Sequence, residues 1–233
     1  MRTFFRLLRC LTDIIAPRLC AICGGRMSAD EDTICARCDM RLPRTGHLSD
    51  LTGNEMARLF WARIAVVRAA AMWMYQPHSE VSAVIYNLKY GGRPEQGRQM
   101  GMAAARELNG AGFFEGISMI VPVPLAKEKL ARRGYNQSEE IARGGAAVTG
   151  LPVATGVVER IRDTESQTRK TDLQRVENVE GAFRLTRPDR VAGRHVLIVD
   201  DVVTTGASMR EATRALLARG AAEVTACSLI RVW

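Results

Sequence analysis

The sequence predicts an α/β protein with a doubly wound, mainly parallel sheet and a small four-cysteine module near the N-terminus. The first observation is that segments of helical periodicity alternate with apolar, strand-like segments, which is the pattern of parallel βαβ units. These apolar segments lie near residues 117–122, 153–161, 196–200 and 223–230. The second observation is a repeated Cys-x-x-Cys pair before residue 40. We therefore expect two parts, with the module in residues 1–55 and the sheet domain in residues 56–233.

The amino-acid composition and the net charge indicate which class of partner the protein binds. Hydrophobic residues at 47% and charged residues at 25% are ordinary for a globular protein. A net charge of +8 and a pI near 9.6 favour anionic partners, which include nucleotides, pyrophosphate and nucleic acid. No apolar run reaches the ~18 residues that a membrane span needs, and no signal-peptide cleavage site is evident. We expect a cytoplasmic protein without stable membrane insertion.

The first sixteen residues carry apolar side chains at roughly helical spacing, with Arg2, Arg6 and Arg9 between them, until Pro17 ends the pattern. This predicts a basic amphipathic helix. Such a helix can lie on a membrane surface or contact a partner. The commoner arrangement, which we favour, is packing against the helix's own domain.

Four cysteines form two Cys-x-x-Cys pairs within nineteen residues, at Cys20, Cys23, Cys35 and Cys38. Four thiolates suit tetrahedral Zn²⁺, and a disulfide is disfavoured in a cytoplasmic protein. With four cysteines as ligands, the metal has no open position for a substrate. We therefore predict a structural zinc that supplies the folding energy of this small segment.

The segment that organises the larger domain runs from residue 196 to residue 208. A buried apolar strand ends in Asp200 and Asp201, and the loop Thr204-Thr205-Gly206-Ala207-Ser208 then leads into a helix near Met209. A tight loop at a helix N-terminus is a natural phosphate site. The two carboxylates require a different partner, such as a vicinal diol or a divalent cation. A phosphate beside a diol describes ribose 5-phosphate.

Basic residues follow two other elements. Lys89 and Arg93 flank a glycine pair after a predicted helix over residues 81–90, where they could hold a phosphate oxygen or simply be solvated. Another four cations follow the strand that ends near Val121, and they suit pyrophosphate or a solvated helix face. These four are Lys127, Lys129, Arg132 and Arg133. Because ligands bind at the carboxyl ends of parallel strands, the loops after residues 121, 161 and 199 should converge.

Residues 162–178 form a long polar segment just before the strand at residue 196. A polar excursion of this length inside a compact domain is usually functional or disordered. Its position favours a mobile lid over the predicted ligand site.

The acids followed by Val-Val-Thr-Thr-Gly-Ala-Ser resemble the phosphoribosyl pyrophosphate (PRPP) loop of the type I phosphoribosyltransferases. Over nearly the whole chain, the sequence resembles more closely the ComF family of phosphoribosyltransferase-like proteins. The matching segments are the four cysteines, Tyr86-Asn-Leu-Lys89, Val121-Pro-Val-Pro124, Arg133-Gly-Tyr-Asn-Gln-Ser138, Arg162 with Gln167-Thr168 and Leu173, and Arg175 with Asn178 and Gly181. The resemblance implies a type I phosphoribosyltransferase fold with an N-terminal zinc-ribbon module.

The resemblance also implies roles for single residues. Asp200 and Asp201 would hold the ribose hydroxyls, residues 204–208 the 5′-phosphate, and residues 122–133 the pyrophosphate, with Mg²⁺ bridging pyrophosphate and ribose. Lys170 or Arg169 in the lid would stabilise the charge on departing pyrophosphate. Lys89, Arg132 and Arg133 complete the predicted PRPP-binding set.

The function implied is transfer of ribose 5-phosphate to an acceptor that the sequence does not identify, in a protein associated with DNA uptake during natural transformation. Two alternatives stay open. One is a non-catalytic accessory that binds single-stranded DNA and serves a competence helicase or recombination partner. The other is a PRPP sensor that binds without turnover.

Overall fold

The computed structural model describes residues 17–162 and 180–233. The predicted N-terminal amphipathic helix therefore lies outside the described residues. The same holds for almost all of the predicted lid, including Arg169 and Lys170.

The main sheet has four parallel strands in the order β1-β6-β5-β2. Their bounds are β1 (Ala69–Met74), β2 (Met119–Pro122), β5 (His195–Val203) and β6 (Glu223–Arg231). The two long central strands pair over their whole length, from His195 opposite Glu223 to Val203 opposite Arg231. The parallel sheet that the alternation predicted is confirmed.

Strand β2 lies at one edge of this sheet, and its position explains how it can end in proline. Pro122 pairs with Val199 of β5, and the N–H of the following Val123 donates to the Val199 carbonyl at 2.8 Å. On the outer side, the Ile120 N–H donates to the Pro152 carbonyl at 2.9 Å. Because alternate residues point their N–H groups to alternate sides, the Pro122 nitrogen is on the outer side, where the missing donor removes no bond to β5.

The prediction of one strand over residues 153–161 in the parallel sheet is wrong. Val153 makes only an isolated parallel bridge with Ile120. Gly156 then takes a left-handed backbone conformation (φ 66°) and redirects the chain. The residues after it form β3 (Val158–Arg160), which pairs antiparallel with β4 (Phe183–Leu185) in a separate two-stranded sheet.

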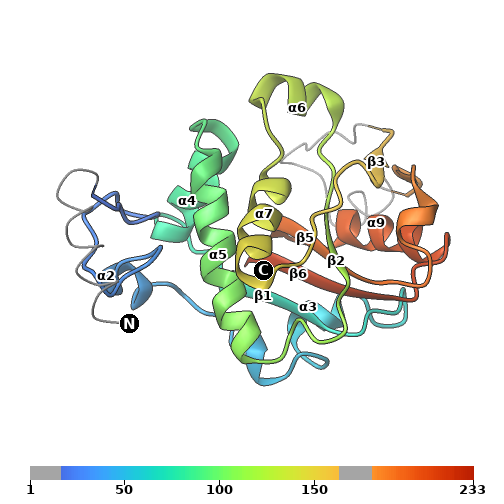
Figure 1. Ribbon diagram of the computed structural model, residues 1–233, viewed down its shortest axis with the longest axis horizontal. Helices are drawn as coiled ribbons and strands as arrows, with labels where there is room; N and C mark the ends of the chain where they lie inside the picture. The colour runs from blue at the N-terminus through green and yellow to red at the C-terminus, as the bar shows by residue number, and fades with distance from the viewer. Residues whose placement is uncertain (1–16, 163–179) are drawn as a thin grey trace.

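Helices cover both faces of the main sheet (Figure 1). One face carries α4 (Glu80–Tyr90), α5 (Pro94–Gly110) and α7 (Gln137–Thr149), and the other carries α3 (Glu55–Arg58) and α9 (Ala207–Leu217). Neighbouring strand residues enter opposite cores: Ala69 and Ala71 pack on the α3 and α9 side, while Ala70 and Met72 pack on the other. This is the doubly wound arrangement that the sequence predicted.

Four short helical segments complete the described elements: α2 (Ala36–Asp39), η1 (His47–Ser49), α6 (Lys127–Arg133) and η2 (Pro188–Arg190). The sequence interpretation gave no separate helix for α6, and it placed the start of α9 near Met209, two residues too late. Helix α4 ends directly before Gly91, as predicted.

Helix α5 links the N-terminal segment to the rest of the fold. On one side it crosses α7 so closely that a Cβ on Gly101 would overlap the Ile141 carbonyl. On the other side, the buried Gln96 amide donates to the Ala21 carbonyl, and Arg44 pairs with Glu107 at 3.1 Å. The cysteine segment is therefore docked against α5 by specific polar contacts.

Within residues 17–162 and 180–233, no helix is both long enough and apolar enough to cross a bilayer.

Candidate functional site

A pocket of about 220 Å³ opens between α4, α6 and α7, beside the acidic part of β5. Its lining includes six of the residues that the sequence singled out: Lys89, Arg132, Arg133, Asp200, Asp201 and Ser208. Lys129 and the unpredicted Tyr90, Asn136, Ser138 and Arg160 also line it. The structure thus brings the segment after β2 next to the acids of β5, as expected. The C-terminal end of α4 also lines the pocket, which was not expected.

Other candidates lie elsewhere. Thr204, Thr205 and Gly206 form the loop between β5 and α9 without lining this pocket, and Ala207 faces away from it. Lys127 pairs with Glu159 at 2.7 Å instead. Arg93 is exposed just before α5.

The two acids lie inside β5, which continues to Val203 rather than ending at Asp200. Asp200 Oδ1 accepts hydrogen bonds from Ser138 Oγ at 2.8 Å and from the Asp201 backbone N–H at 2.9 Å. Burial, followed by the negative charge of Asp201, raises the pKa of Asp200 to about 7. A cation or a hydrogen-bond donor that enters the pocket would therefore favour the ionised form of Asp200 near neutral pH.

Cations face the acids across the pocket. Lys89 Nζ lies 3.4 Å from Asp201 Oδ2. Arg133 Nε donates to the Lys89 carbonyl at 3.0 Å, which fixes the guanidinium, and burial lowers the pKa of Arg133. Two atoms here are buried without a hydrogen-bond partner among the described residues: Arg133 Nη1, a donor, and Asp201 Oδ2, an acceptor. Asp201 Oδ2 has only its ion pair with Lys89, and Arg133 Nη1 has no partner among the described residues. Buried polar atoms without hydrogen bonds are costly, so these two atoms in one pocket favour a ligand with both acceptor and donor groups.

The loop between β5 and α9 is held by two buried arginines. Arg210 Nη1 donates to the carbonyls of Thr205 and Leu59, the latter at 3.1 Å. Arg231 Nη1 donates to the carbonyls of Val203, at 3.2 Å, and Thr204. Successive loop carbonyls are thus engaged by guanidinium groups, while the first N–H groups of α9 have no partner within the helix. This arrangement suits a phosphate.

Gly206 is required at the turn itself. Its φ is 72°, in the left-handed region, and a Cβ there would lie 3.2 Å from Leu59 Cδ1. Both the backbone conformation and the close approach of Leu59 disfavour any other residue.

Comparison with known proteins decides the family. The model of the phosphoribosyl transferase domain matches residues 109–232, which is more than half of the chain. The DNA utilization protein YhgH of Escherichia coli K12 is 33% identical over 218 residues, covering 91% of this chain and 90% of the relative. The chain belongs to the ComF family of phosphoribosyltransferase-like proteins.

Further relatives agree with this assignment. Competence protein F of Haemophilus influenzae is 32% identical over 48% of this chain and 49% of its own length, and competence protein ComFC of Bacillus subtilis is 24% identical over 91% and 95%. Among solved structures, the glutamine PRPP amidotransferase of B. subtilis with ADP and GMP is 23% identical, covers 57% of this chain and 25% of its own, and has a TM-score of 0.39. The family has a type I phosphoribosyltransferase fold, and this chain adds a four-cysteine group near its N-terminus.

The cysteines of this ComF-family chain form a candidate metal centre. The Sγ atoms of Cys20, Cys23, Cys35 and Cys38 all lie within 4.8 Å of one another. The Cys23 and Cys35 Sγ atoms are 3.8 Å apart, close to the spacing of about 3.8 Å that tetrahedral Zn–S bonds of about 2.3 Å produce. The donor set and its geometry therefore fit Zn²⁺.

Backbone N–H groups support these sulfurs. Gly25 donates to Cys23 Sγ at 3.4 Å, and Cys35 donates to Cys20 Sγ at 3.3 Å. The Gly25 N–H is the main reason why the pKa of Cys23 falls to about 6. The surroundings of Cys23 thus favour thiolate, the form that binds metal, whereas burial raises the pKa of Cys38. Cys227, by contrast, is buried in β6, and burial raises its pKa to about 12.

Sequence reasoning assigned no role to the segment between α6 and α7, although the segment was part of the family resemblance. Tyr135 Oη donates to the Leu88 carbonyl at 2.7 Å, and Asn136 Nδ2 donates to the Val123 carbonyl at 3.0 Å. Ser138 then reaches Asp200. This segment therefore ties α4, the end of β2 and β5 together around the pocket. The signal that could have indicated it was the polar run immediately after Arg133.

Proposed function

We propose that this ComF-family protein binds PRPP with Mg²⁺ in the pocket beside Asp200 and Asp201, and transfers ribose 5-phosphate to an acceptor. The observation that carries the proposal is that Arg133 Nη1 and Asp201 Oδ2 are buried in one pocket and form no hydrogen bond with the described residues, although Lys89 Nζ forms an ion pair with Asp201 Oδ2. PRPP supplies a complement to each, because pyrophosphate oxygens accept hydrogen bonds and ribose hydroxyls donate them.

The proposed roles follow the positions of the residues. Asp200 and Asp201 accept hydrogen bonds from the ribose hydroxyls. The loop Thr204-Thr205-Gly206-Ala207-Ser208 receives the 5′-phosphate on backbone N–H groups and hydroxyls. Lys89, Arg132 and Arg133 bind the pyrophosphate. A Mg²⁺ ion fits the same carboxylates, because it prefers oxygen ligands and would remove the penalty of ionising Asp200.

Catalysis then depends on positioning and electrostatics. As pyrophosphate leaves, C1 of the ribose gains positive character, and the carboxylates fix the sugar while the cations accept the growing negative charge. Bound Mg²⁺ supplies further neutralisation of the pyrophosphate. We assign the same task to Lys170, which lies outside the described residues. No protein nucleophile is required.

A second candidate function has its own support. Tyr86 and Tyr90, 64% and 69% exposed, lie on α4 beside the pocket with ring centroids 5.4 Å apart. Exposed aromatic rings next to cations are the usual platform for single-stranded nucleic acid. A role in DNA uptake through binding of single-stranded DNA, with a competence helicase or recombination protein as partner, is therefore the alternative. PRPP sensing without turnover is the third.

We also propose that the zinc is structural, that residues 1–55 form its module and residues 56–233 the phosphoribosyltransferase-like domain, and that the protein is cytoplasmic. The support is the four-cysteine geometry, which leaves the metal no open position, and thiols that favour a reducing compartment.

Isothermal titration of PRPP with Mg²⁺ tests the main proposal. The parent should bind PRPP, and the Asp200→Asn, Asp201→Asn double variant should lose binding by at least tenfold. Asp189→Asn changes an exposed aspartate away from the pocket and should bind as the parent does. Equal binding by all three proteins, or none by the parent, would refute a PRPP site here and favour the nucleic-acid alternative.

A further inference from the structure

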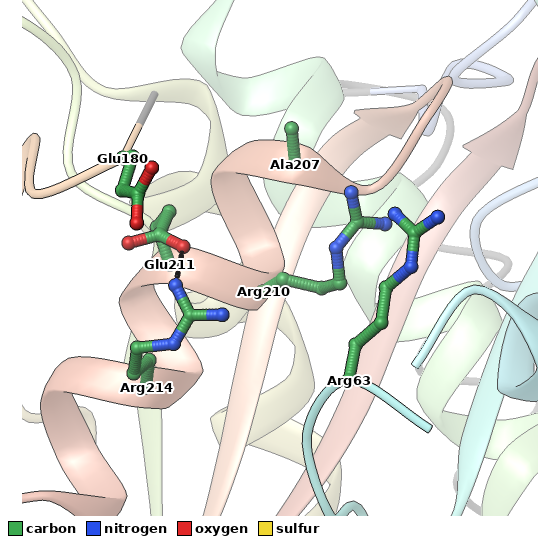
Figure 2. Close-up of a pocket in the computed structure, with 6 residues that line it drawn as sticks. All are labelled: Arg63, Glu180, Ala207, Arg210, Glu211 and Arg214. Carbon is green, nitrogen blue, oxygen red and sulfur yellow. Dashed lines mark hydrogen bonds and ion pairs between the residues drawn. The ribbon is translucent and has the colours of Figure 1, made fainter. Parts of the chain in front are cut away.

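A second cavity lies against α9 and is lined by other residues than the PRPP pocket. Figure 2 shows the residues that line it. Its volume is about 240 Å³. Ala207 borders this cavity, whereas its neighbour Ser208 borders the PRPP pocket. The remaining lining residues are Arg63, Glu180, Arg210, Glu211 and Arg214. The α9 residues among them are spaced as one helix face, so the first turn of α9 separates two distinct cavities.

Two guanidinium groups converge at one end of the second cavity. Figure 2 shows Arg63, from the segment between α3 and β1, reaching toward Arg210 of α9. Arg210 is only 5% exposed, and its Nη1 is held by the carbonyls of Leu59 and Thr205. Burial and then the charge of Arg63 lower the pKa of Arg210. The two cations are therefore close enough to repel each other.

The carboxylates of the cavity do not balance this charge. Glu211 forms an ion pair with Arg214 and accepts a hydrogen bond from the Gly181 N–H at 3.2 Å. Glu180 lies beside Glu211, at the far end from Arg63 (Figure 2). Within the part of the chain that the structure describes, neither Arg63 nor Arg210 forms an ion pair with a carboxylate. Among the described residues, the two cations of the basic end thus have no ion-pair partner, although the charge of Glu211 also acts on Arg210.

We propose that this cavity is a second anion site, which takes inorganic phosphate or a small phosphomonoester between Arg63 and Arg210. A tetrahedral anion can accept hydrogen bonds from both guanidinium groups at once. The site is separate from the PRPP pocket and does not depend on the proposed function.

Arg210 gives this site a route to the PRPP loop, because the same guanidinium holds the Thr205 carbonyl. An anion that binds Arg210 from the cavity should therefore change the mobility of the loop over residues 204–208, whose Thr205 carbonyl Arg210 holds. By linkage, any effect of the anion on PRPP affinity equals the effect of PRPP on the anion.

Titration of the full chain with inorganic phosphate, followed by phosphorus NMR or calorimetry, tests the proposal. Arg63→Gln alters an exposed side chain, so the fold should be kept, and phosphate binding should weaken at least tenfold. Arg63→Lys should retain part of the affinity. The matched control is Arg219→Gln, an exposed arginine just after α9 that does not line the cavity, and it should bind phosphate as the parent does.

A second variant separates the two pockets. Arg133→Gln removes a cation from the PRPP pocket only. It should leave unchanged the phosphate-binding step that Arg63→Gln weakens, even if phosphate and PRPP no longer bind in the PRPP pocket. Phosphate binding that responds to Arg133→Gln and not to Arg63→Gln would place the phosphate in the PRPP pocket and overturn the proposal. Absence of phosphate binding in the millimolar range would overturn it as well.

Discussion

The cysteine module and the PRPP pocket are both arranged around a ligand, but they are built in different ways. The module brings four sulfurs together between Cys20 and Cys38, where the only helix among the described residues is the single turn α2, so we expect its geometry to depend on the metal. The pocket is assembled by long strands and helices, and buried arginines already hold its phosphate loop. From this difference we expect that removal of the ligand unfolds the cysteine module but leaves the PRPP pocket folded.

The largest effect should follow from removal of a cysteine ligand. Cys35→Ser takes away one of four thiolates, and because structural zinc contributes roughly 10–16 kcal/mol in small zinc-binding peptides, the module should lose its fold. We expect about one zinc per chain in the parent and none in the variant by elemental analysis. Cys10→Ser changes a cysteine that is not part of either Cys-x-x-Cys pair, and this variant should keep its zinc. A variant that retains stoichiometric zinc would show that the four cysteines do not form the centre.

On the pocket side, the strongest effect should come from Arg210→Met. The substitution leaves the carbonyls of Leu59 and Thr205 without a partner, and each buried unsatisfied group costs about 1–3 kcal/mol. We expect the free energy of unfolding to fall by about 2–5 kcal/mol in urea denaturation. Arg214→Met, one turn further along α9, removes only an exposed ion pair and should cost less than about 1 kcal/mol. Equal losses would mean that Arg210 does not hold the loop.

A smaller effect, of opposite sign, is expected for Asp200→Asn. In the folded state the pKa of Asp200 is raised to about 7, above its ordinary value of 3.8, so the folded state holds the proton more tightly than the unfolded state. The parent must therefore lose stability as pH rises from about 4 through 7, and the uncharged asparagine does not.

Thermal denaturation of parent and Asp200→Asn at two pH values checks this sign. The variant should be more stable than the parent at pH 8, on the order of 2 kcal/mol, and the gain should shrink at pH 5. PRPP binding should nevertheless weaken. A gain that is the same at both pH values would show that the charge of Asp200 is not its source.

The smallest effect is expected for Ser138→Ala. Ser138 Oγ donates to Asp200 and favours its ionised form, so its loss should raise the pKa of Asp200 further above 7. PRPP affinity should fall roughly three- to tenfold at pH 7, consistent with the ~0.5–1.5 kcal/mol of a typical hydrogen bond, and recover at higher pH. Calorimetry across pH would detect this shift. Ser82→Ala on α4, where the hydroxyl bonds only to the Ser79 carbonyl, should leave the pH profile unchanged.

The features that could be predicted from the sequence are those that depend on residues close together in the chain. The apolar run before Asp200, the turn at Gly206 and the paired cysteines each occupy a short segment, so their geometry could be inferred from neighbouring residues. The single strand over residues 153–161 was wrong because one left-handed glycine, Gly156, divides it. Periodicity alone does not reveal such a turn.

Contacts between distant segments could not be predicted. Arg210 holds the Leu59 carbonyl across 151 positions of the chain, and Ser138 meets Asp200 across 62. Nothing near either residue in the sequence specifies its partner. The sequence also did not show which of the four cations after β2 reach the pocket. Arg133 lines the pocket, whereas Lys127 pairs with Glu159 outside it.

The most direct test of the PRPP site is a crystal structure with PRPP and Mg²⁺. The account predicts a pyrophosphate oxygen within ~2.7–3.0 Å of Arg133 Nη1 and a ribose hydroxyl donating to Asp201 Oδ2, so that both buried atoms gain the hydrogen bonds that they lack among the described residues. PRPP bound elsewhere, or bound here with these two atoms still unpaired, would contradict the central claim.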